Sequence, residues 1–255
     1  MGKAAMTGWQ TELVHNGFVL FEGMCPLPTF HTANQAIDYD LTHHYDPEQQ
    51  HAYDHRSYCP GLRKAPAISA LLTESGAKGP LNSLFGFRNL RCHDGQIAIR
   101  RPRNAAQPQP PTPHIDGIAT AHNGVRRTSL QTFTALIGVF LSETPGTFAG
   151  NFTVWPGSHL RLQEHFRSAG RPALRGGMPD LDLGTPQQLI TRPGDVILCH
   201  YLLAHAAAVN CSDVERRAVF FRTWQKGLAL RRWHHLTNIW AGWRIPPEAL
   251  TQSTL

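Results

Sequence analysis

The sequence predicts a mostly β fold, a barrel or a sandwich, preceded by helices. From about residue 84 onwards, short apolar runs alternate with Gly, Pro and Asn, a pattern typical of many short strands rather than βαβ units. Before that point, apolar side chains recur at helical spacing. The chain has 255 residues, which suits one domain with its own core, and it shows no internal repeat and no linker.

The N-terminal part, residues 1–83, is expected to be helices and loops. The first helix has Trp9, Leu13 and Val14 on one side, and Gly17 follows it as a C-terminal glycine. A region rich in His, Asp and Tyr, bounded by Pro47 and Pro60, is expected to be a loop with at most one helical turn. The expected elements are a helix over 8–16, a strand over 17–22, a helix over 29–43, a loop over 43–60 and a helix over 65–76.

The barrel core is expected over 84–225, followed by a C-terminal extension over 226–255. The segment 101–113 contains five prolines and is predicted to be an irregular loop, because proline cannot donate into a sheet interior. Residues 156–184 are read as a long insertion, the kind of loop that often forms a lid. Strands are predicted over 85–91, 95–101, 132–142, 151–155, 187–191, 195–203 and 216–225.

Composition excludes several classes of function. The net charge of +6 is scattered in Arg pairs without a basic stripe, so no nucleic-acid partner is expected. No apolar run reaches the roughly 18 residues of a membrane span, and the first residues lack a signal-peptide core. Five cysteines without a C-x-x-C pair favour a reducing cytoplasm. Fifteen histidines, in contrast, favour a metal site.

Two histidines and one aspartate are the candidate metal ligands. If His114 and Asp116 end a strand, their side chains point to the same face because side chains alternate with period two. His205, at the end of a predicted strand, is the third candidate. Two imidazoles and one carboxylate leave three positions of an octahedron open, which is the facial triad of non-haem iron(II) oxygenases.

A second His-x-Asp pair shows that this spacing alone is weak. His44 and Asp46 have the same spacing, but they lie before the predicted barrel. They are not followed by the glycine turn, apolar strand and histidine that follow His114 and Asp116. His114 and Asp116 are followed by the Gly194-Asp195 turn, an apolar strand, and then His205. The sequence therefore favours His114 and Asp116 as ligands, and His44 and Asp46 as surface residues.

An arginine eleven residues after His205 is the candidate partner of an anionic cosubstrate. A guanidinium presents a planar fork that matches a carboxylate. On the predicted strand 216–225, Arg216 would face the metal and Arg217 would face the opposite side. A surface ion pair is the competing interpretation, and it is favoured for Arg217.

Four stretches together resemble the phytanoyl-CoA dioxygenase-like family of iron(II)- and 2-oxoglutarate-dependent oxygenases. The resemblance covers about residues 10–225, and its specificity lies in the ordered set. The stretches are 15–21 (HNGFVLF), 113–117 (PHIDG), 150–159 (GNFTVWPGSH) and 194–205 (GDVILCHYLLAH), the last continued by Asn210, Ser212, Arg216 and Arg217.

The resemblance implies a double-stranded β-helix, which is a jelly-roll or cupin-like barrel, with Fe(II), 2-oxoglutarate and O₂ as cofactors. It implies His114, Asp116 and His205 as ligands and Arg216 as the anchor of 2-oxoglutarate. Arg101 resembles a further basic position of the family, with Arg100 as the alternative by one residue. His159 and His200 are implied to be structural. One departure is Ala207, where relatives often carry a serine that contacts the cosubstrate.

The implied activity is hydroxylation or desaturation of a small organic molecule, with 2-oxoglutarate converted to succinate and CO₂. Two alternatives stay open: a cupin-like metalloprotein acting as a hydrolase or isomerase, and an inactive binding module. The substrate and the oligomeric state are not determined by the sequence. An anionic substrate is expected from the arginines near the predicted mouth, which are Arg100, Arg101, Arg103, Arg126 and Arg127.

Overall fold

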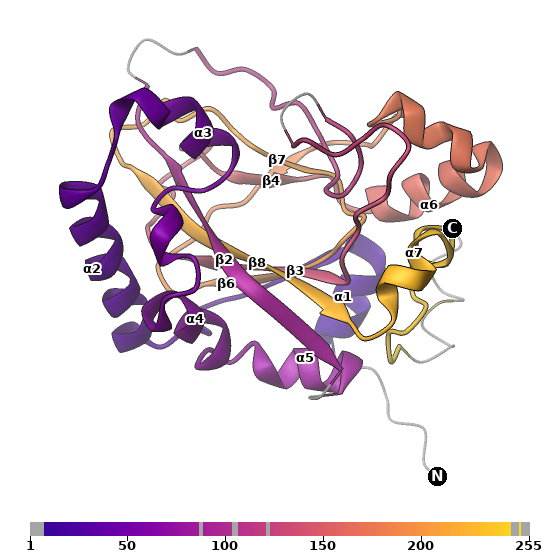
Figure 1. Ribbon diagram of the computed structural model, residues 1–255, viewed down its shortest axis with the longest axis horizontal. Coiled ribbons are helices and arrows are strands. Elements are labelled where there is room, and N and C mark those ends of the chain that lie inside the picture. The colour runs from indigo at the N-terminus through magenta and orange to yellow at the C-terminus, as the bar shows by residue number, and fades with distance from the viewer. Residues whose placement is uncertain (1–7, 87–88, 104–106, 121–122, 246–249, 251–255) are drawn as a thin grey trace.

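Two antiparallel sheets face each other and form the centre of the molecule (Figure 1). The computed structural model describes residues 8–86, 89–103, 107–120, 123–245 and 250. The larger sheet has the strand order β1-β6-β3-β8-β2 and the smaller one β5-β4-β7. The strands are β1 (Phe18–Phe21), β2 (Leu90–Arg100), β3 (Ala135–Phe140), β4 (Phe152–Val154), β5 (Gln187–Gln188), β6 (Val196–His200), β7 (His205–Ala207) and β8 (Arg216–Gln225).

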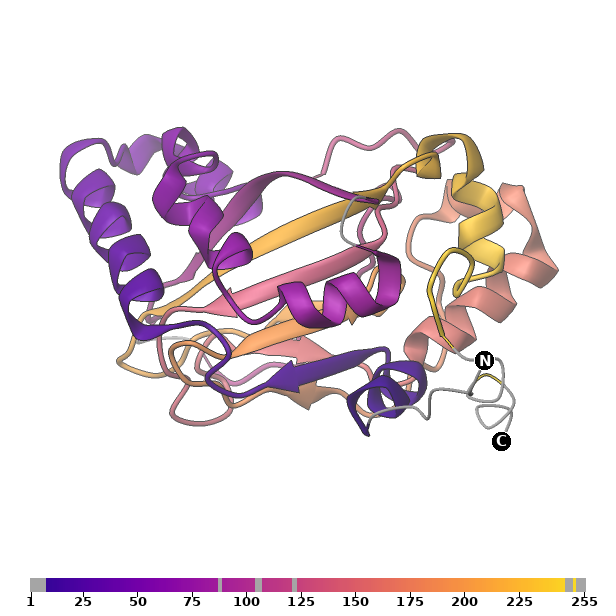
Figure 2. The same ribbon diagram turned by 90° about the horizontal axis from the view of Figure 1, so that it is seen from below.

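Helices cover the outer face and one end of this sandwich. The helices of the first third of the chain lie over the outer face of the larger sheet (Figure 2), where α4 contacts β2, β3 and β8. At one end, α6 packs against α7. The helices are α1 (Gly8–Asn16), α2 (Leu27–His43), α3 (Gln50–His55), α4 (Pro66–Thr73), α5 (Lys78–Phe85), α6 (Ser158–Ala169) and α7 (Leu228–Thr237), with short 3-10 turns η1 (Pro47–Gln49), η2 (Pro60–Leu62) and η3 (Arg171–Gly176).

Alternation along the strands divides the core into two layers. Val219 and Phe221 of β8 pack among the helices, whereas Ala218 and Phe220 point between the two sheets. The apolar layer between the sheets also receives side chains from α6 and from the chain around α7. The side of β8 that carries Arg216, Ala218, Phe220 and Arg222 is therefore the inner face of the larger sheet.

Several predicted elements need correction. The fold is mixed α/β, and helices hold more of the described residues than strands do. The predicted strands 85–91 and 95–101 are the end of α5 and one long strand, β2, with a register shift between Cys92 and Gly95. The insertion 156–184 contains α6, and the extension after 225 contains α7. Residues 104–106 of the predicted proline-rich loop and most of 246–255 lie outside the described residues.

Closure into a barrel is not seen. Strands β2 and β7 are edges of their sheets, and the strand pairings leave the two sheets separate in the described chain. At one end Asn210 links these edges, because its carbonyl accepts the Arg103 amide at 2.9 Å and its side chain donates to the Arg100 carbonyl at 2.7 Å. No described helix is both long and apolar enough to cross a bilayer.

A pair of buried histidines supports the packing between β6, α6 and the C-terminal segment. His159 is fully buried and its Nε2 donates to the Val14 carbonyl at 3.1 Å. His200 donates from Nε2 to the Ile239 carbonyl and accepts the Leu202 amide at Nδ1. These bonds use both ring nitrogens of His200 and one of His159, whose buried Nδ1 has no hydrogen-bond partner among the described residues, and they suit neutral rings. Burial accordingly lowers the pKa of His159 to about 4 and that of His200 well below its usual value.

We expect the protein to lose stability as the pH falls from about 6.5 towards 4. In that range the unfolded chain binds protons at His159 and His200, whereas burial keeps these rings unprotonated in the folded chain. The free energy of unfolding therefore decreases as the pH is lowered. For His159 alone the effect is on the order of 3 kcal/mol below pH 4, of which about 2 kcal/mol is lost by pH 5. Denaturant unfolding between pH 7.5 and 5 measures it. His159→Gln should flatten the profile and the exposed His31→Gln should not; equal slopes in all three proteins would contradict the assignment.

Candidate metal centre

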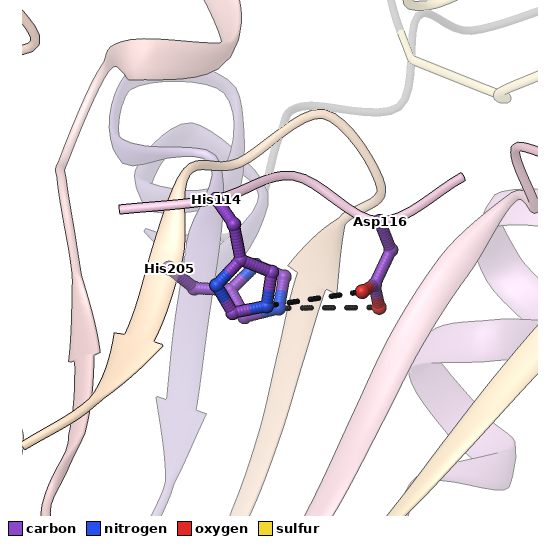
Figure 3. Close-up of side chains that lie close together, drawn as sticks. All are labelled: His114, Asp116 and His205. Atoms are coloured by element: carbon purple, nitrogen blue, oxygen red, sulfur yellow. Dashed lines mark ion pairs between the residues drawn. The ribbon is translucent and has the colours of Figure 1, made fainter. Parts of the chain in front are cut away.

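Three side chains able to bind a metal converge between the sheets, and they are His114, Asp116 and His205 (Figure 3). Their ligand atoms all lie within 4.8 Å of one another. Each histidine Nε2 is 3.9 Å from one carboxylate oxygen of Asp116, His114 from Oδ1 and His205 from Oδ2. With metal bonds of about 2.1 Å, adjacent ligands of an octahedron lie about 3.0 Å apart, so these side chains would move closer together by about 1 Å to hold a single ion.

The backbone holds the two histidines together. The amide of His114 donates to the carbonyl of His205, and the amide of His205 donates back, both at 3.0 Å. Asp116 follows two residues later, and Gly117 then turns the chain with a φ of 83°. Its carbonyl accepts the Gln131 amide at 2.7 Å. A Cβ at position 117 would lie 2.7 Å from the backbone of Gln131, so only glycine allows this turn.

Hydrogen bonds orient the ligand atoms, and the surroundings set the protonation of His114 and Asp116. The Nδ1–H of His205 donates to the Leu203 carbonyl at 2.9 Å, which leaves the Nε2 lone pair facing the cluster. Burial, reinforced by His205, lowers the pKa of His114 to about 4. Burial raises the pKa of Asp116, but the charges of Arg222 and of the two histidines outweigh it and hold that pKa well below its usual value. The neutral imidazole of His114 and the ionised carboxylate of Asp116 are therefore available, and the bond from Nδ1 of His205 orients its Nε2 towards them.

Arg216 lies on the same inner face of β8 and is almost fully buried, with 1% of its surface exposed. Its Nε donates to the Gly150 carbonyl at 2.7 Å and its Nη1 to the Ala98 carbonyl at 3.2 Å. Burial, with Arg100 nearby, lowers the pKa of Arg216 to about 9. None of the ion pairs found among the described residues involves Arg216. A buried guanidinium held only by carbonyls keeps its charge without a counter-ion and is therefore able to bind an anion.

Arg217 is placed differently. Its Nε donates to Glu215 at 2.7 Å and its Nη1 to Asp38 at 2.6 Å, so two carboxylates balance its charge. Its side chain leaves β8 on the face opposite to Arg216. The structure thus separates the two neighbouring arginines as alternation predicts.

Arg100 ends β2 and Arg101 follows it, and both line one cavity with different partners. Arg101 stacks on the Tyr45 ring, with its Cζ 4.5 Å from the ring centre, and forms an ion pair with Glu215 at 3.4 Å. Arg100 is directly opposite Arg216 in the β2–β8 register. Together with Ala207, it lines a cavity of about 340 Å³ between α3, the end of β2 and the segment after β7.

The other histidines considered above do not join the cluster. The ring of His44 is exposed and pairs with Asp40 at 3.1 Å, while Asp46 accepts the Glu48 amide and begins η1. His159 and His200 are the buried structural pair described above.

Sequence reasoning missed Arg222. Its Nε and Nη2 donate to Oδ2 of Asp116 at 2.9 and 2.7 Å. The signal that could have found it is the alternation of β8, which puts Arg216 and Arg222 on one face, six residues apart.

No protein-family model matches the chain, and no curated protein matches it. Solved structures do. SnoK, a non-heme α-ketoglutarate (2-oxoglutarate)-dependent carbocyclase of nogalamycin biosynthesis, matches with a TM-score of 0.58 at 18% identity, over 87% of this chain and 84% of SnoK. HygX from Streptomyces hygroscopicus, with nickel and 2-oxoglutarate bound, matches with a TM-score of 0.56 at 18% identity, over 88% of each chain. The chain has the fold of non-heme 2-oxoglutarate-dependent enzymes.

The epimerase SnoN, in complex with Fe³⁺, α-ketoglutarate and nogalamycin RO, is a third match, with a TM-score of 0.56 at 17% identity, over 85% of this chain and 82% of SnoN. The bound metals and cosubstrates belong to those proteins, and identities this low establish likeness of fold only. Within that fold, this chain has its own cluster of His114, Asp116 and His205 as a candidate for metal binding.

Proposed function

We propose that the chain is an Fe(II)- and 2-oxoglutarate-dependent dioxygenase of the phytanoyl-CoA dioxygenase-like type. It hydroxylates or desaturates a small organic molecule and converts 2-oxoglutarate to succinate and CO₂. The observation that carries the proposal is the buried Arg216 without a carboxylate partner, on the sheet face that also bears the Arg222 contact to the metal cluster. A metalloprotein that uses no dicarboxylate cosubstrate would not need this guanidinium.

The residues present fit the proposed metal. Nitrogen from His114 and His205 and oxygen from Asp116 form the mixed set typical of Fe(II) oxygenases. When bound, iron supplies the oxidising chemistry that O₂ and 2-oxoglutarate make possible. The protein keeps the His114 imidazole neutral and the Asp116 carboxylate ionised, and it orients His205 through the bond from its Nδ1 to the Leu203 carbonyl. It also limits water, because the His205 ring is largely buried against Phe152, with ring centres 5.4 Å apart.

The cosubstrate would bind with its distal carboxylate on Arg216. Ala207 offers no hydroxyl there, so a second contact must come from another residue. Arg100 is placed for this role, because it lies opposite Arg216 and lines the cavity that Ala207 also lines. Arg101 was the first choice from the sequence, but its guanidinium contacts Tyr45 and Glu215. We therefore prefer Arg100 as the second basic residue at the cosubstrate.

The substrate is proposed to be a small molecule that carries an anionic group. Arg100, Arg101 and Arg103 lie around one cavity, and among the described residues that line it Asp54 is the one carboxylate. Arg127 lies elsewhere and donates to the Arg175 carbonyl of η3. Among the structural matches, HygX has been solved with hygromycin B and SnoN with nogalamycin RO, so small-molecule substrates suit the fold.

Succinate formation tests the proposal. The purified chain is loaded with Fe(II) without oxygen, then given 2-oxoglutarate and air, with and without a library of anionic small molecules. We expect succinate that depends on iron and O₂, and faster formation with the substrate. Iron binding without any binding of 2-oxoglutarate would point to a cupin-like hydrolase or isomerase instead. Binding of neither would point to a recognition module.

We expect the product to be oxygenated or desaturated and never chlorinated. The carboxylate of Asp116 fills the position and supplies the negative charge that a halide ligand would otherwise bring, so chloride would have to displace it. Turnover under labelled O₂ in high chloride, read by mass spectrometry, measures the outcome. A chlorinated product from the unaltered protein would refute the role given to Asp116.

A further inference from the structure

Each of the three nitrogens of the Arg222 guanidinium has a hydrogen-bond acceptor. Two of its nitrogens, Nε and Nη2, donate to the same oxygen of Asp116, Oδ2, at 2.9 and 2.7 Å. The third, Nη1, donates to Oε1 of Gln96 on β2 at 2.7 Å. The ring of Phe133 lies beside it, 5.7 Å from Cζ. Among the ion pairs of the described residues, Asp116 is the carboxylate that Arg222 contacts.

This contact makes the two oxygens of Asp116 unequal. Oδ2 accepts two charged N–H groups, which occupy its lone pairs and draw electron density from it. Oδ1 receives no such bond from Arg222 and lies 3.9 Å from Nε2 of His114 (Figure 3). Oδ1 is therefore the stronger electron donor to a metal, and Oδ2 is the weaker one because it already accepts the two N–H groups of Arg222.

We propose that Arg222 is a positioning residue of the metal centre, which reserves Oδ1 of Asp116 as the single carboxylate ligand. This inference rests on the proposed metal site. Single-oxygen binding keeps the remaining positions open for a chelating cosubstrate and O₂. If the carboxylate is removed, Arg222 and the two histidines become a binding site for a small carboxylate anion, of the size of formate or acetate.

The second part follows from charge. Asp116→Ala would leave the Arg222 guanidinium partly buried beside Gln96, with no carboxylate and a space the size of the missing group. An uncompensated charge in such a place is costly and attracts an anion. One oxygen of a formate ion could accept hydrogen bonds from Nε and Nη2 of Arg222, as Oδ2 of Asp116 does. Its other oxygen would then face the metal in place of Oδ1.

The first experiment measures metal affinity with Ni²⁺ and Co²⁺ by calorimetry and by the visible absorption of Co²⁺. Arg222→Gln should bind metal about 10- to 100-fold more weakly, as expected for loss of an outer partner of a ligand. Its Co²⁺ spectrum should shift as Oδ2 becomes free to bind. Arg222→Lys should recover affinity in part, because an ammonium keeps the charge but lacks the fork. Arg217→Gln is the matched control, an arginine of the same strand with its partners on the outer face.

The second experiment adds formate or acetate to Asp116→Ala. We expect metal binding to return with added anion in Asp116→Ala and not in the double variant Asp116→Ala/Arg222→Gln. Circular dichroism checks that each variant is folded. Equal rescue in both variants, no rescue in either, or wild-type affinity and spectrum in Arg222→Gln would overturn the proposal. If the unaltered protein bound no metal, the proposed function would fail first, so the two failures are distinguishable.

Discussion

His205→Ala and His114→Ala are each expected to abolish metal binding, whereas His44→Ala should retain it. The unaltered chain should bind about one Fe(II) ion per molecule, since one cluster supplies one facial set of ligands. Removing either imidazole leaves one nitrogen and one carboxylate, too few to hold a weakly bound divalent ion. The readout is metal content after dialysis and calorimetric titration without oxygen.

His44 is a demanding control because it has the same spacing to an aspartate. Its ring is exposed and pairs with Asp40, so its loss removes a surface contact only. If His44→Ala lost iron while His114→Ala kept it, the choice of ligands would be wrong. Circular dichroism should show both variants folded, because the backbone bridge between residues 114 and 205 does not depend on the imidazoles.

Arg216→Ala is expected to weaken 2-oxoglutarate binding by on the order of tenfold to a hundredfold, and Arg217→Ala to change it little. Hydrogen bonds to a charged group contribute about 1.5 to 3 kcal/mol, and of these two arginines Arg216 is the one on the inner face of β8. Calorimetric titration of the nickel-loaded protein with 2-oxoglutarate measures the affinity without turnover.

Arg217→Ala is the matched control, because it removes an equal positive charge one residue away. It also removes the bonds of Arg217 to Asp38 and Glu215 on the opposite face of β8. Arg216→Ala also strips donors from the carbonyls of Gly150 and Ala98, which could lower stability. Arg216→Lys is therefore measured as well and should lie between the two. Equal, small effects of all three substitutions would remove Arg216 as the anchor.

The sequence predicted the parts of the fold that carry a clear period. The helices at 8–16 and 65–76 and the strands around β3, β6 and β8 appear near the expected positions. Helix α5 was missed because Gly79 and Pro80 suggest a loop, although proline is tolerated in a first helical turn. Helix α6 was hidden by the Gly-, Arg- and Pro-rich segment around it, yet Leu162 and Phe166 have helical spacing and Gly170 follows its end.

For the candidate site, spacing indicated which residues converge but not what contacts them. The sequence indicated that His114 and Asp116 share a face, because side chains alternate along a strand. It indicated His205 because a glycine turn and an apolar strand precede this residue. Arg222 of β8 contacts both Asp116 and Gln96 of β2, and such contacts depend on strand register, which the sequence does not specify. The choice between Arg100 and Arg101 depends in the same way on which residue ends β2 facing inward.

The backbone bridge between His114 and His205 closes a loop of about 90 residues with two hydrogen bonds. Closing so long a loop costs chain entropy, and each doubling of loop length adds about 0.6 kcal/mol to that cost. An ion bound by both histidines would cross-link the two ends of this segment and would slow the opening of the backbone bridge between residues 114 and 205. Amide hydrogen exchange at positions 114 and 205 should therefore become much slower when metal is bound, while amides in β1 exchange at an unchanged rate.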